Sequence, residues 1–291
     1  MTDDGILHVE RHATPADFLD AAGSFLVERE AEHNLIFGIC ATLAADPGYA
    51  SEPYLATVSK AGRVVGSGVM TPPWNLVLSC TDEPDSPGAL ATDLDARGIT
   101  VPGTTGPVDV ARRFANVWCG THALERGPGI AERVYRLERV VPPDGVGGTV
   151  RVATEADRDL LIPWVAAFAA EALDRADPEG AAAMVDRSFR AGTRTWYLWE
   201  DDGPVSIAAA GGPTPNGIRI GPVYTPPEHR RHGYASALTA AVSQTQLDQG
   251  RRFVFLFTDL ANPTSNKIYQ AIGYEPVIDV DQITFVPADT G

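Results

Sequence analysis

The pattern of apolar and polar positions repeats itself along the chain. Each half opens with a short strand that alternates apolar and polar residues, at residues 6–11 and at residues 149–153. A Thr-x-x-Asp sequence follows each strand, at residues 14–17 and 154–157, and this spacing is typical of a helix N-cap. We infer an internal duplication of one α/β unit.

Each half then continues with more helix, two strands across a tight turn, and a third strand. The paired strands are residues 54–59 with 64–70, joined around Ala61-Gly62, and residues 195–199 with 205–210, joined around Asp202-Gly203. The third strands are residues 76–80 and 218–224. Helix, strand, helix and a closing hairpin follow in each half. This order requires at least one parallel pair within a mixed sheet.

The segment at residues 141–148, Val-Pro-Pro-Asp-Gly-Val-Gly-Gly, combines turn formers with no apolar period. It lies close to the midpoint of the 291 residues, and the length fits two domains or one large one. We therefore predict one lobe at residues 1–145 and a second at residues 149–291.

The second half has the clearer pattern. Residues 231–249 predict a helix that stops at Gly250. Residues 253–257, Phe-Val-Phe-Leu-Phe, form a continuous apolar run, as in a strand buried on both faces. Asn262 is the predicted cap of a short helix that ends at Gly273, and residues 277–286 supply the closing strands.

Composition narrows the classes of partner. The formal net charge is −15, so a nucleic-acid backbone would be repelled, while a cationic partner is allowed. The three cysteines, Cys40, Cys80 and Cys119, are too far apart in sequence to form a metal or redox pair, and we expect no metal site. The first residues do not resemble a signal peptide, and no apolar run reaches the roughly 18 residues of a membrane span. We expect a soluble, cytoplasmic protein without a membrane partner.

The most informative stretch is the turn between the strand at residues 218–224 and the helix that follows. Arg230 and Arg231 supply positive charge, and Gly233 lets the backbone approach a ligand closely. Ala235 and Ser236 are small, and a helix start presents free N–H groups. This combination predicts an anion site suited to a pyrophosphate. The alternative is a solvated, charged turn. Neither a Walker-type phosphate loop nor a Gly-x-Gly-x-x-Gly dinucleotide motif is present.

The same stretch resembles the acetyl-coenzyme-A loop of the GNAT acyltransferase superfamily, Gln/Arg-x-x-Gly-x-Gly/Ala, with Arg230, Gly233 and Ala235 at those positions. A second element, Asn262…Ser265…Tyr269 followed by Gly273-Tyr274, resembles the last-helix signature of that family. The resemblance covers roughly residues 149–286, and the first half matches only in its order of elements. It implies an α/β (α+β) fold of two GNAT-like lobes, each a mixed, mostly antiparallel sheet flanked by helices.

The resemblance also implies acetyl-coenzyme A as cofactor, with its pantetheine arm between splayed strands at residues 218–225 and 253–257. The implied cofactor-binding residues are Val223, Tyr224, Thr225, Arg230, Arg231, His232, Gly233, Tyr234, Ala235, Ser236, Asn262, Ser265 and Asn266. Tyr269 is the candidate general acid for the departing thiolate, because its face of the helix is polar. The alternative for Tyr269 is an ordinary core tyrosine bonded to backbone.

The acceptor side is less defined, and the sequence does not name the general base. Glu171 and Asp174 lie three residues apart on the first helix of the second half and are tentative acceptor-site residues. A solvated helix face is an equal alternative for both. In the first half, the corresponding loop at residues 81–88 is acidic, and residues 103–114 resemble a helix start. We expect that lobe to be non-catalytic.

These observations favour an acetyl-coenzyme-A-dependent N-acetyltransferase with a small-molecule or protein amine as acceptor. The rival from another class is a non-enzymatic acyl-coenzyme-A-binding or sensing module. Neither the acceptor nor the oligomeric state can be derived from this sequence.

Overall fold

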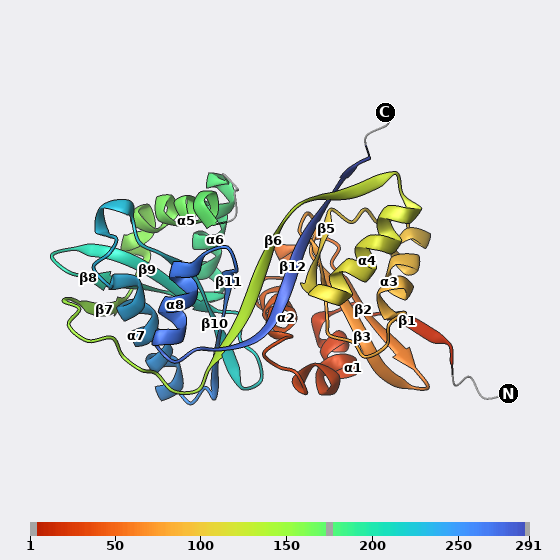
Figure 1. Ribbon diagram of the computed structural model, residues 1–291, viewed down its shortest axis with the longest axis horizontal. Helices are drawn as coiled ribbons and strands as arrows, with labels where there is room; N and C mark the ends of the chain where they lie inside the picture. The colour runs from red at the N-terminus through yellow and green to blue at the C-terminus, as the bar shows by residue number, and fades with distance from the viewer. Residues whose placement is uncertain (1–4, 173–176, 289–291) are drawn as a thin grey trace. The chain divides into compact units, whose positions relative to one another are not determined.

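The computed structural model describes residues 5–172 and 177–288 (Figure 1). Its elements occur twice in the same order, as an internal duplication would produce. The first series is β1 (Leu7–Arg11), α1 (Pro15–Val27), α2 (Asn34–Ala45), β2 (Tyr54–Lys60), β3 (Arg63–Met70), β4 (Leu76–Leu78), α3 (Ser86–Ala96), β5 (Gly103–Pro107), α4 (Val108–Thr121) and β6 (Leu124–Leu137). The second is β7 (Thr149–Val152), α5 (Arg158–Ala172), α6 (Pro178–Ala191), β8 (Arg194–Glu200), β9 (Pro204–Gly211), β10 (Gly217–Tyr224), α7 (Tyr234–Asp248), β11 (Phe253–Asp259), α8 (Pro263–Ala271) and β12 (Glu275–Pro287).

The predicted helix caps are present. Thr14 caps α1, and its Oγ1 accepts a hydrogen bond from the Asp17 N–H at 3.1 Å. Thr154 and Asp157 form a reciprocal capping box at the short 3-10 turn before α5. These local bonds satisfy N–H groups that a helix start leaves unpaired, so the sequence sets where each helix begins.

The contacts divide the chain into two compact units, and the division differs from a cut at the 141–148 segment. The first unit holds residues up to Arg133 together with those from Ile278 onward, and the second is Val134–Val277. The long strand β6 therefore begins in one unit and ends in the other, and so does β12.

In the first unit the strands follow the order β1-β2-β3-β4-β5-β12-β6. Neighbours are antiparallel from β1 to β4, β4 and β5 are parallel, and β5 and β12 are antiparallel. Side chains alternate between the two faces. Leu55, Val69 and Val77 pack with α1 and α2, whereas Ala56, Met70 and Leu76 pack with residues of α3 and α4.

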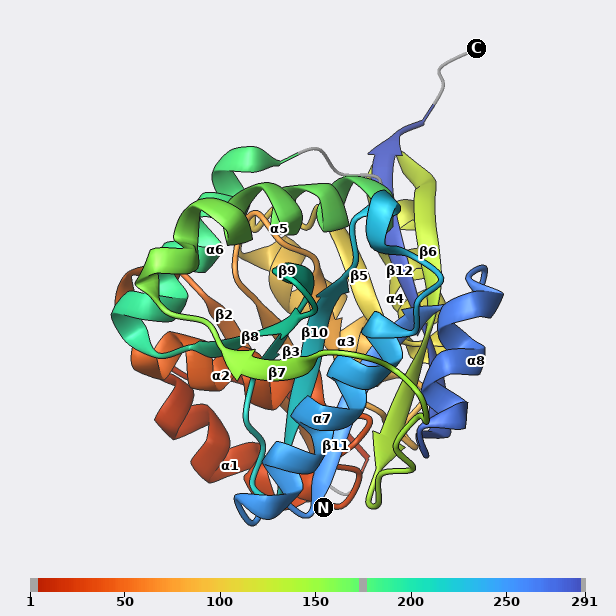
Figure 2. The ribbon, with the colours of Figure 1, turned by 90° about the vertical axis from the view of Figure 1, so that its left-hand side faces the viewer.

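In the second unit the strand order is β7-β8-β9-β10-β11-β6. The first four strands are antiparallel, and β10 and β11 are parallel. Alternation again covers both faces: Trp196 and Leu198 pack with α5 and α6, while Tyr197 and Trp199 pack with α7. Figure 2 shows α5 and α6 on one side of these strands and α7 on the other. Both units therefore have the expected mixed, mostly antiparallel sheet flanked by helices.

Two local predictions are wrong. Residues 103–107 form the strand β5, and α4 starts only at Val108. Each series ends in one long strand, β6 or β12, instead of a closing hairpin. Strand β12 lies between β5 and β6, and it pairs with β5 from Val280 opposite Pro107 to Thr284 opposite Gly103. Neither neighbour is joined to β12 by a tight turn.

Candidate functional site

The bend between β10 and α7 carries the features expected of an anion site. Arg231 and Gly233 both have left-handed backbone conformations, with φ of 68° and 83°. Gly233 is the N-cap residue of α7, and no side chain caps this helix. The first turn, with Tyr234 and the half-buried Ala235 and Ser236, thus presents its N–H groups and the positive end of the helix without a side-chain partner.

The start of the bend is held by the side chain of Arg230. Its Nε donates a hydrogen bond to the Thr225 carbonyl at 2.9 Å, and its Nη2 donates to Glu171 Oε2 at 2.6 Å. Its Cζ lies 5.7 Å from the ring centroid of Tyr224. The Tyr224 hydroxyl donates to the other carboxylate oxygen of Glu171 at 3.1 Å, and burial followed by this bond raises the pKa of Tyr224. Sequence reasoning did not find this cluster, because Glu171 lies 59 residues from Arg230.

The remaining side chains of the bend differ in how they are held. His232 Nδ1 lies 3.3 Å from the His229 carbonyl oxygen, and its ring stacks on Tyr234 with centroids 5.4 Å apart. The Tyr234 hydroxyl donates to Asp201, and this bond raises the pKa of Tyr234. Arg231 is exposed and forms no ion pair or hydrogen bond with the described residues. Its charge is therefore free for a ligand.

Strands β10 and β11 part as they approach this bend. The parallel ladder joins residues 217–219 to residues 253–255, and no pair follows, although the strands continue to Tyr224 and Asp259. The register of β10 with β9 shifts between Ile220 and Val223, and Val223 is half-buried. Such a bulge redirects a strand away from its neighbour. The expected parting of the two strands is present.

The polar side of α8 shapes the start of that helix. Asn262 is the N-cap, and its Oδ1 accepts a hydrogen bond from the N–H of the half-buried Ser265 at 3.0 Å. Asn266 Nδ2 donates to the Asp259 carbonyl at 2.9 Å, and Asn266 Oδ1 accepts from the Tyr135 hydroxyl at 2.9 Å. Both asparagines thus have protein partners that hold α8 at the end of β11.

Tyr269 follows on the same helix and is half-buried. Its hydroxyl has no hydrogen-bond partner among the described residues, so the bond to backbone expected of an ordinary core tyrosine is absent. Burial raises its pKa to about 12. The neighbouring Tyr274, whose ring centroid lies 6.0 Å away, has its hydroxyl 2.9 Å from Ser243 Oγ. The two tyrosines therefore differ in whether a ligand could use the hydroxyl.

The sequence offers two tentative acceptor-site residues, Glu171 and Asp174. Glu171 is bound by Tyr224 and Arg230 at the bend between β10 and α7. Asp174 lies outside the described residues.

The corresponding turn of the first unit, between β4 and α3, is built differently. Thr81 Oγ1 accepts a hydrogen bond from the Glu83 N–H at 3.0 Å. Asp82 pairs with Arg29 at 3.0 Å, and Glu83 pairs with Lys60 at 2.6 Å. The turn thus contributes carboxylates where the second unit contributes arginines. That the first lobe is non-catalytic stays a prediction.

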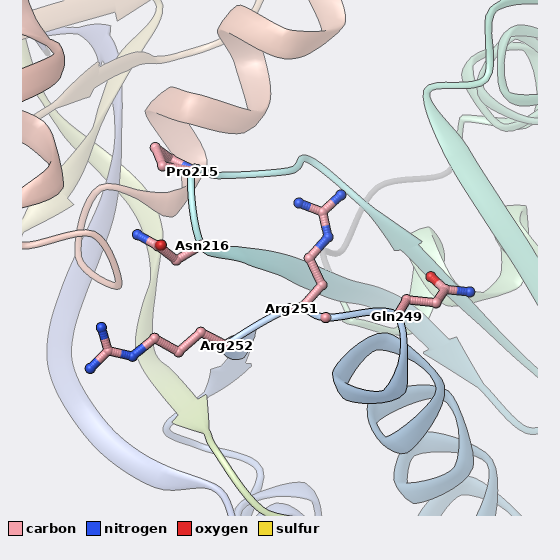
Figure 3. A pocket seen from close by; sticks show the side chains of 6 residues that line it. Pro215, Asn216, Gln249, Arg251 and Arg252 are labelled. Carbon is pink, nitrogen blue, oxygen red and sulfur yellow. The ribbon is translucent and has the colours of Figure 1, made fainter.

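A polar crevice lies at the opposite end of α7 (Figure 3), lined by Pro215, Asn216, Gln249, Gly250, Arg251 and Arg252. The Arg252 guanidinium carbon lies 4.8 Å from the ring centroid of Phe253. This end of α7 presents helix carbonyls and hence the negative end of the dipole. The N-terminal bend is therefore the better site for an anion.

Among the described residues, no helix is both long and apolar enough to cross a membrane.

Comparisons with known proteins bear on the family and the fold. Residues 203–283 match the model of FR47-like proteins, a GNAT-related family. No curated protein sequence matches the chain. The fold is similar to a GNAT-family acetyltransferase from Colwellia psychrerythraea, with a TM-score of 0.56 and 10% identity over 96% of this chain and 100% of that one.

Two further solved structures are similar along most of the chain. A GCN5-related N-acetyltransferase from Kribbella flavida gives a TM-score of 0.55 at 18% identity, over 88% of this chain and 96% of that one. A tandem GNAT protein from the clavulanic acid biosynthesis pathway gives 0.58 at 15% identity, over 98% of this chain and 100% of that one. The GNAT resemblance of the sequence is thus confirmed, and the protein has the GNAT acetyltransferase fold.

Proposed function

We propose that this protein is an N-acetyltransferase that transfers the acetyl group of acetyl-coenzyme A to a primary amine. The observation that carries the proposal is the uncapped start of α7, preceded by two left-handed residues, at the place where β10 and β11 part. Free N–H groups and a helix dipole suit a diphosphate, and parted strands suit an extended amide-containing arm that pairs with backbone.

The residues present fit this substrate in three ways. Arg231 offers an unpaired charge next to the uncapped N–H groups of α7. The backbone of β10 and β11 beyond their last ladder pair is not shared between the two strands. Tyr269 offers a hydroxyl without a protein partner on the helix that follows β11.

The reaction forms a bond between the amine nitrogen and the carbonyl carbon and breaks the bond from that carbon to sulfur. The amine loses a proton to solvent or to a base that the structure does not single out, and the sulfur leaves as a thiolate. A free thiol has a pKa of about 8.5. Because the pKa of Tyr269 is about 12, its hydroxyl stays protonated at neutral pH and donates a hydrogen bond to the sulfur.

The test combines binding with turnover. We would titrate acetyl-coenzyme A into the wild-type protein and into Gly233→Glu by calorimetry. We would also follow thiol release with a panel of small amines and peptides. The proposal predicts binding by the wild type, loss of binding in Gly233→Glu, and amine-dependent thiol release. Equal binding by both proteins would refute the site. Tight binding without turnover on any amine would favour the rival acyl-coenzyme-A-binding module.

A further inference from the structure

The position of Glu171 connects the helix α5 to the diphosphate bend. We propose that Glu171 is a positioning residue that fixes Arg230 and thereby sets the backbone of the bend for the cofactor. This inference rests on the proposed function and deepens it. It also reassigns Glu171, which the sequence associates with the acceptor.

Glu171 lies in the last turn of α5, and both of its carboxylate oxygens already accept hydrogen bonds. Oε2 accepts from Arg230 Nη2 at 2.6 Å, and Oε1 accepts from the Tyr224 hydroxyl at 3.1 Å. A group that takes a proton from the acceptor amine needs a free lone pair directed at it. The two bonds do not fill all the lone pairs of the carboxylate. They hold it toward Arg230 and Tyr224 at the bend, so a structural role fits its geometry better.

The contacts of Arg230 carry the effect of Glu171 into the bend. Its Nε donates to the Thr225 carbonyl at 2.9 Å, which closes the chain from residue 225 to residue 230 into a ring. Thr225 is anchored in turn, because its Oγ1 lies 2.9 Å from Ser206 Oγ on β9. Arg230 is thus held by its own backbone loop on one side and by α5 on the other.

These contacts of Arg230 fix the start of the segment that carries the left-handed residues Arg231 and Gly233. Those conformations are costly for an arginine and persist only when the surroundings hold them. A bend already set before the ligand arrives binds more tightly, since less freedom is lost on binding. Glu171 would therefore act on cofactor affinity through Arg230 and would not touch the reacting atoms.

The exposure of the Arg230–Glu171 ion pair limits how much Glu171 can change cofactor affinity. The side chains of Arg230 and Glu171 are 42% and 48% exposed, so water screens their attraction. The Tyr224 bond and the ring contact add to the ion pair but do not bury it. We expect Glu171→Gln to weaken cofactor binding by roughly three- to tenfold.

The experiment measures coenzyme A binding by calorimetry and steady-state rates in the full chain. Glu171→Gln should raise the Kd for coenzyme A and the KM for acetyl-coenzyme A by the same factor. Its kcat and the KM for the amine should stay near wild-type values. Asp159→Asn is the matched control, because Asp159 lies on the same helix with a side chain 97% exposed. It should bind coenzyme A as the wild type does.

A double-mutant cycle tests the route of the effect. In an Arg230→Gln background, Glu171→Gln should have no further effect on the Kd. Wild-type binding by Glu171→Gln, a change confined to the KM of the amine, or full additivity with Arg230→Gln would each overturn the inference. Thermal unfolding should give Glu171→Gln a Tm close to that of the wild type. Such a result would show that weaker binding does not come from loss of the fold. If the wild type itself does not bind coenzyme A, the proposed function fails as well, which is a different result.

Discussion

Val146 occupies the space that a side chain at Gly233 would need: an ideal Cβ on Gly233 would lie 2.8 Å from Val146 Cγ2. Val146 belongs to the 141–148 segment, whose Gly147 carbonyl accepts a hydrogen bond from Trp199 Nε1 at 2.8 Å. The segment that the sequence marks only as a linker thus lies against the N-cap of α7. Glycine is required at 233 for its positive φ and for this contact.

Gly233→Ala should therefore destabilise the protein more than the same substitution at a glycine that has a positive φ but free space around its ideal Cβ. Gly250, at the other end of α7, is the matched control, because its φ is 90° and nothing lies within 4 Å of its ideal Cβ. We expect a loss of about 1 kcal/mol for Gly250→Ala and about 2–3 kcal/mol for Gly233→Ala in urea unfolding. Val146→Ala should lower the free energy of unfolding less in the Gly233→Ala background than in the wild type, because it removes the clash. Equal losses at both glycines would contradict the contact.

Tyr269→Phe should lower kcat by roughly tenfold to a hundredfold while the Kd for acetyl-coenzyme A stays unchanged. The hydroxyl has no protein partner among the described residues, so removing it should leave the free energy of unfolding near the wild-type value. Tyr274→Phe is the control with the opposite behaviour: it loses the contact with Ser243 and should cost about 1 kcal/mol of stability with little change in rate. Unchanged turnover of Tyr269→Phe at saturating substrate would remove Tyr269 from the reaction.

Arg231→Gln should weaken coenzyme A binding by roughly three- to tenfold at low salt and make the affinity less dependent on salt. The reason is that the Arg231 side chain is exposed and has no partner among the described residues. Arg251→Gln removes an arginine from the crevice at the other end of α7 and should leave the affinity unchanged. A loss in Arg251→Gln alone would place the anion at that crevice instead.

Asp157 should make the second unit sensitive to acid. Hydrogen bonds from Arg151, above all, lower its pKa from 3.8 to about 2, and its side chain is 13% exposed. A lowered pKa in the folded state means stability that is present above about pH 4 and is lost as the pH falls towards 2. This corresponds to about 2 kcal/mol.

Urea unfolding of Asp157→Asn at pH 7 and at pH 2 measures that contribution. The variant should be less stable than the wild type at pH 7, and the difference should shrink towards pH 2. Asp159→Asn, whose carboxylate is 97% exposed, should show no such trend. A difference of the same size at both values would show that Asp157 does not titrate in this way.

Local signals in the sequence predicted a hairpin turn in each unit and the elements β11 and α8 of the second unit. The turn residues Ala61 and Asp202 have positive φ, each beside a glycine, as the predicted hairpins require. The apolar run at residues 253–257 lies within β11, and Asn262 caps α8. These features depend on near neighbours in the chain, so a single sequence contains them.

Features set by distant partners could not be predicted in the same way. Arg126-Gly-Pro-Gly129 has the composition of a turn, yet β6 runs through it. Its glycines are needed because β12 approaches closely: a Cβ on Gly129 would lie 2.0 Å from the Gln282 carbonyl oxygen. Similarly, a Cβ on Gly103 would lie 2.4 Å from the Ile283 carbonyl oxygen. The close approach of β12 therefore requires glycine in β5, although glycine disfavours strands.

In the candidate site, too, some features depend on near neighbours in the sequence and others on distant partners. The residues of the bend follow from their spacing along the chain. The contact of Glu171 with Arg230 and that of Val146 with Gly233 join elements distant in sequence, and no local pattern indicates them.

We propose above all that the backbone from Arg230 to Ser236 binds a diphosphate. A crystal structure of the protein grown with coenzyme A tests this most directly. We expect diphosphate oxygens within hydrogen-bond distance of the N–H groups at the start of α7, with the pantetheine arm between β10 and β11. A coenzyme A molecule bound elsewhere on the chain, with this bend free of ligand, would contradict it.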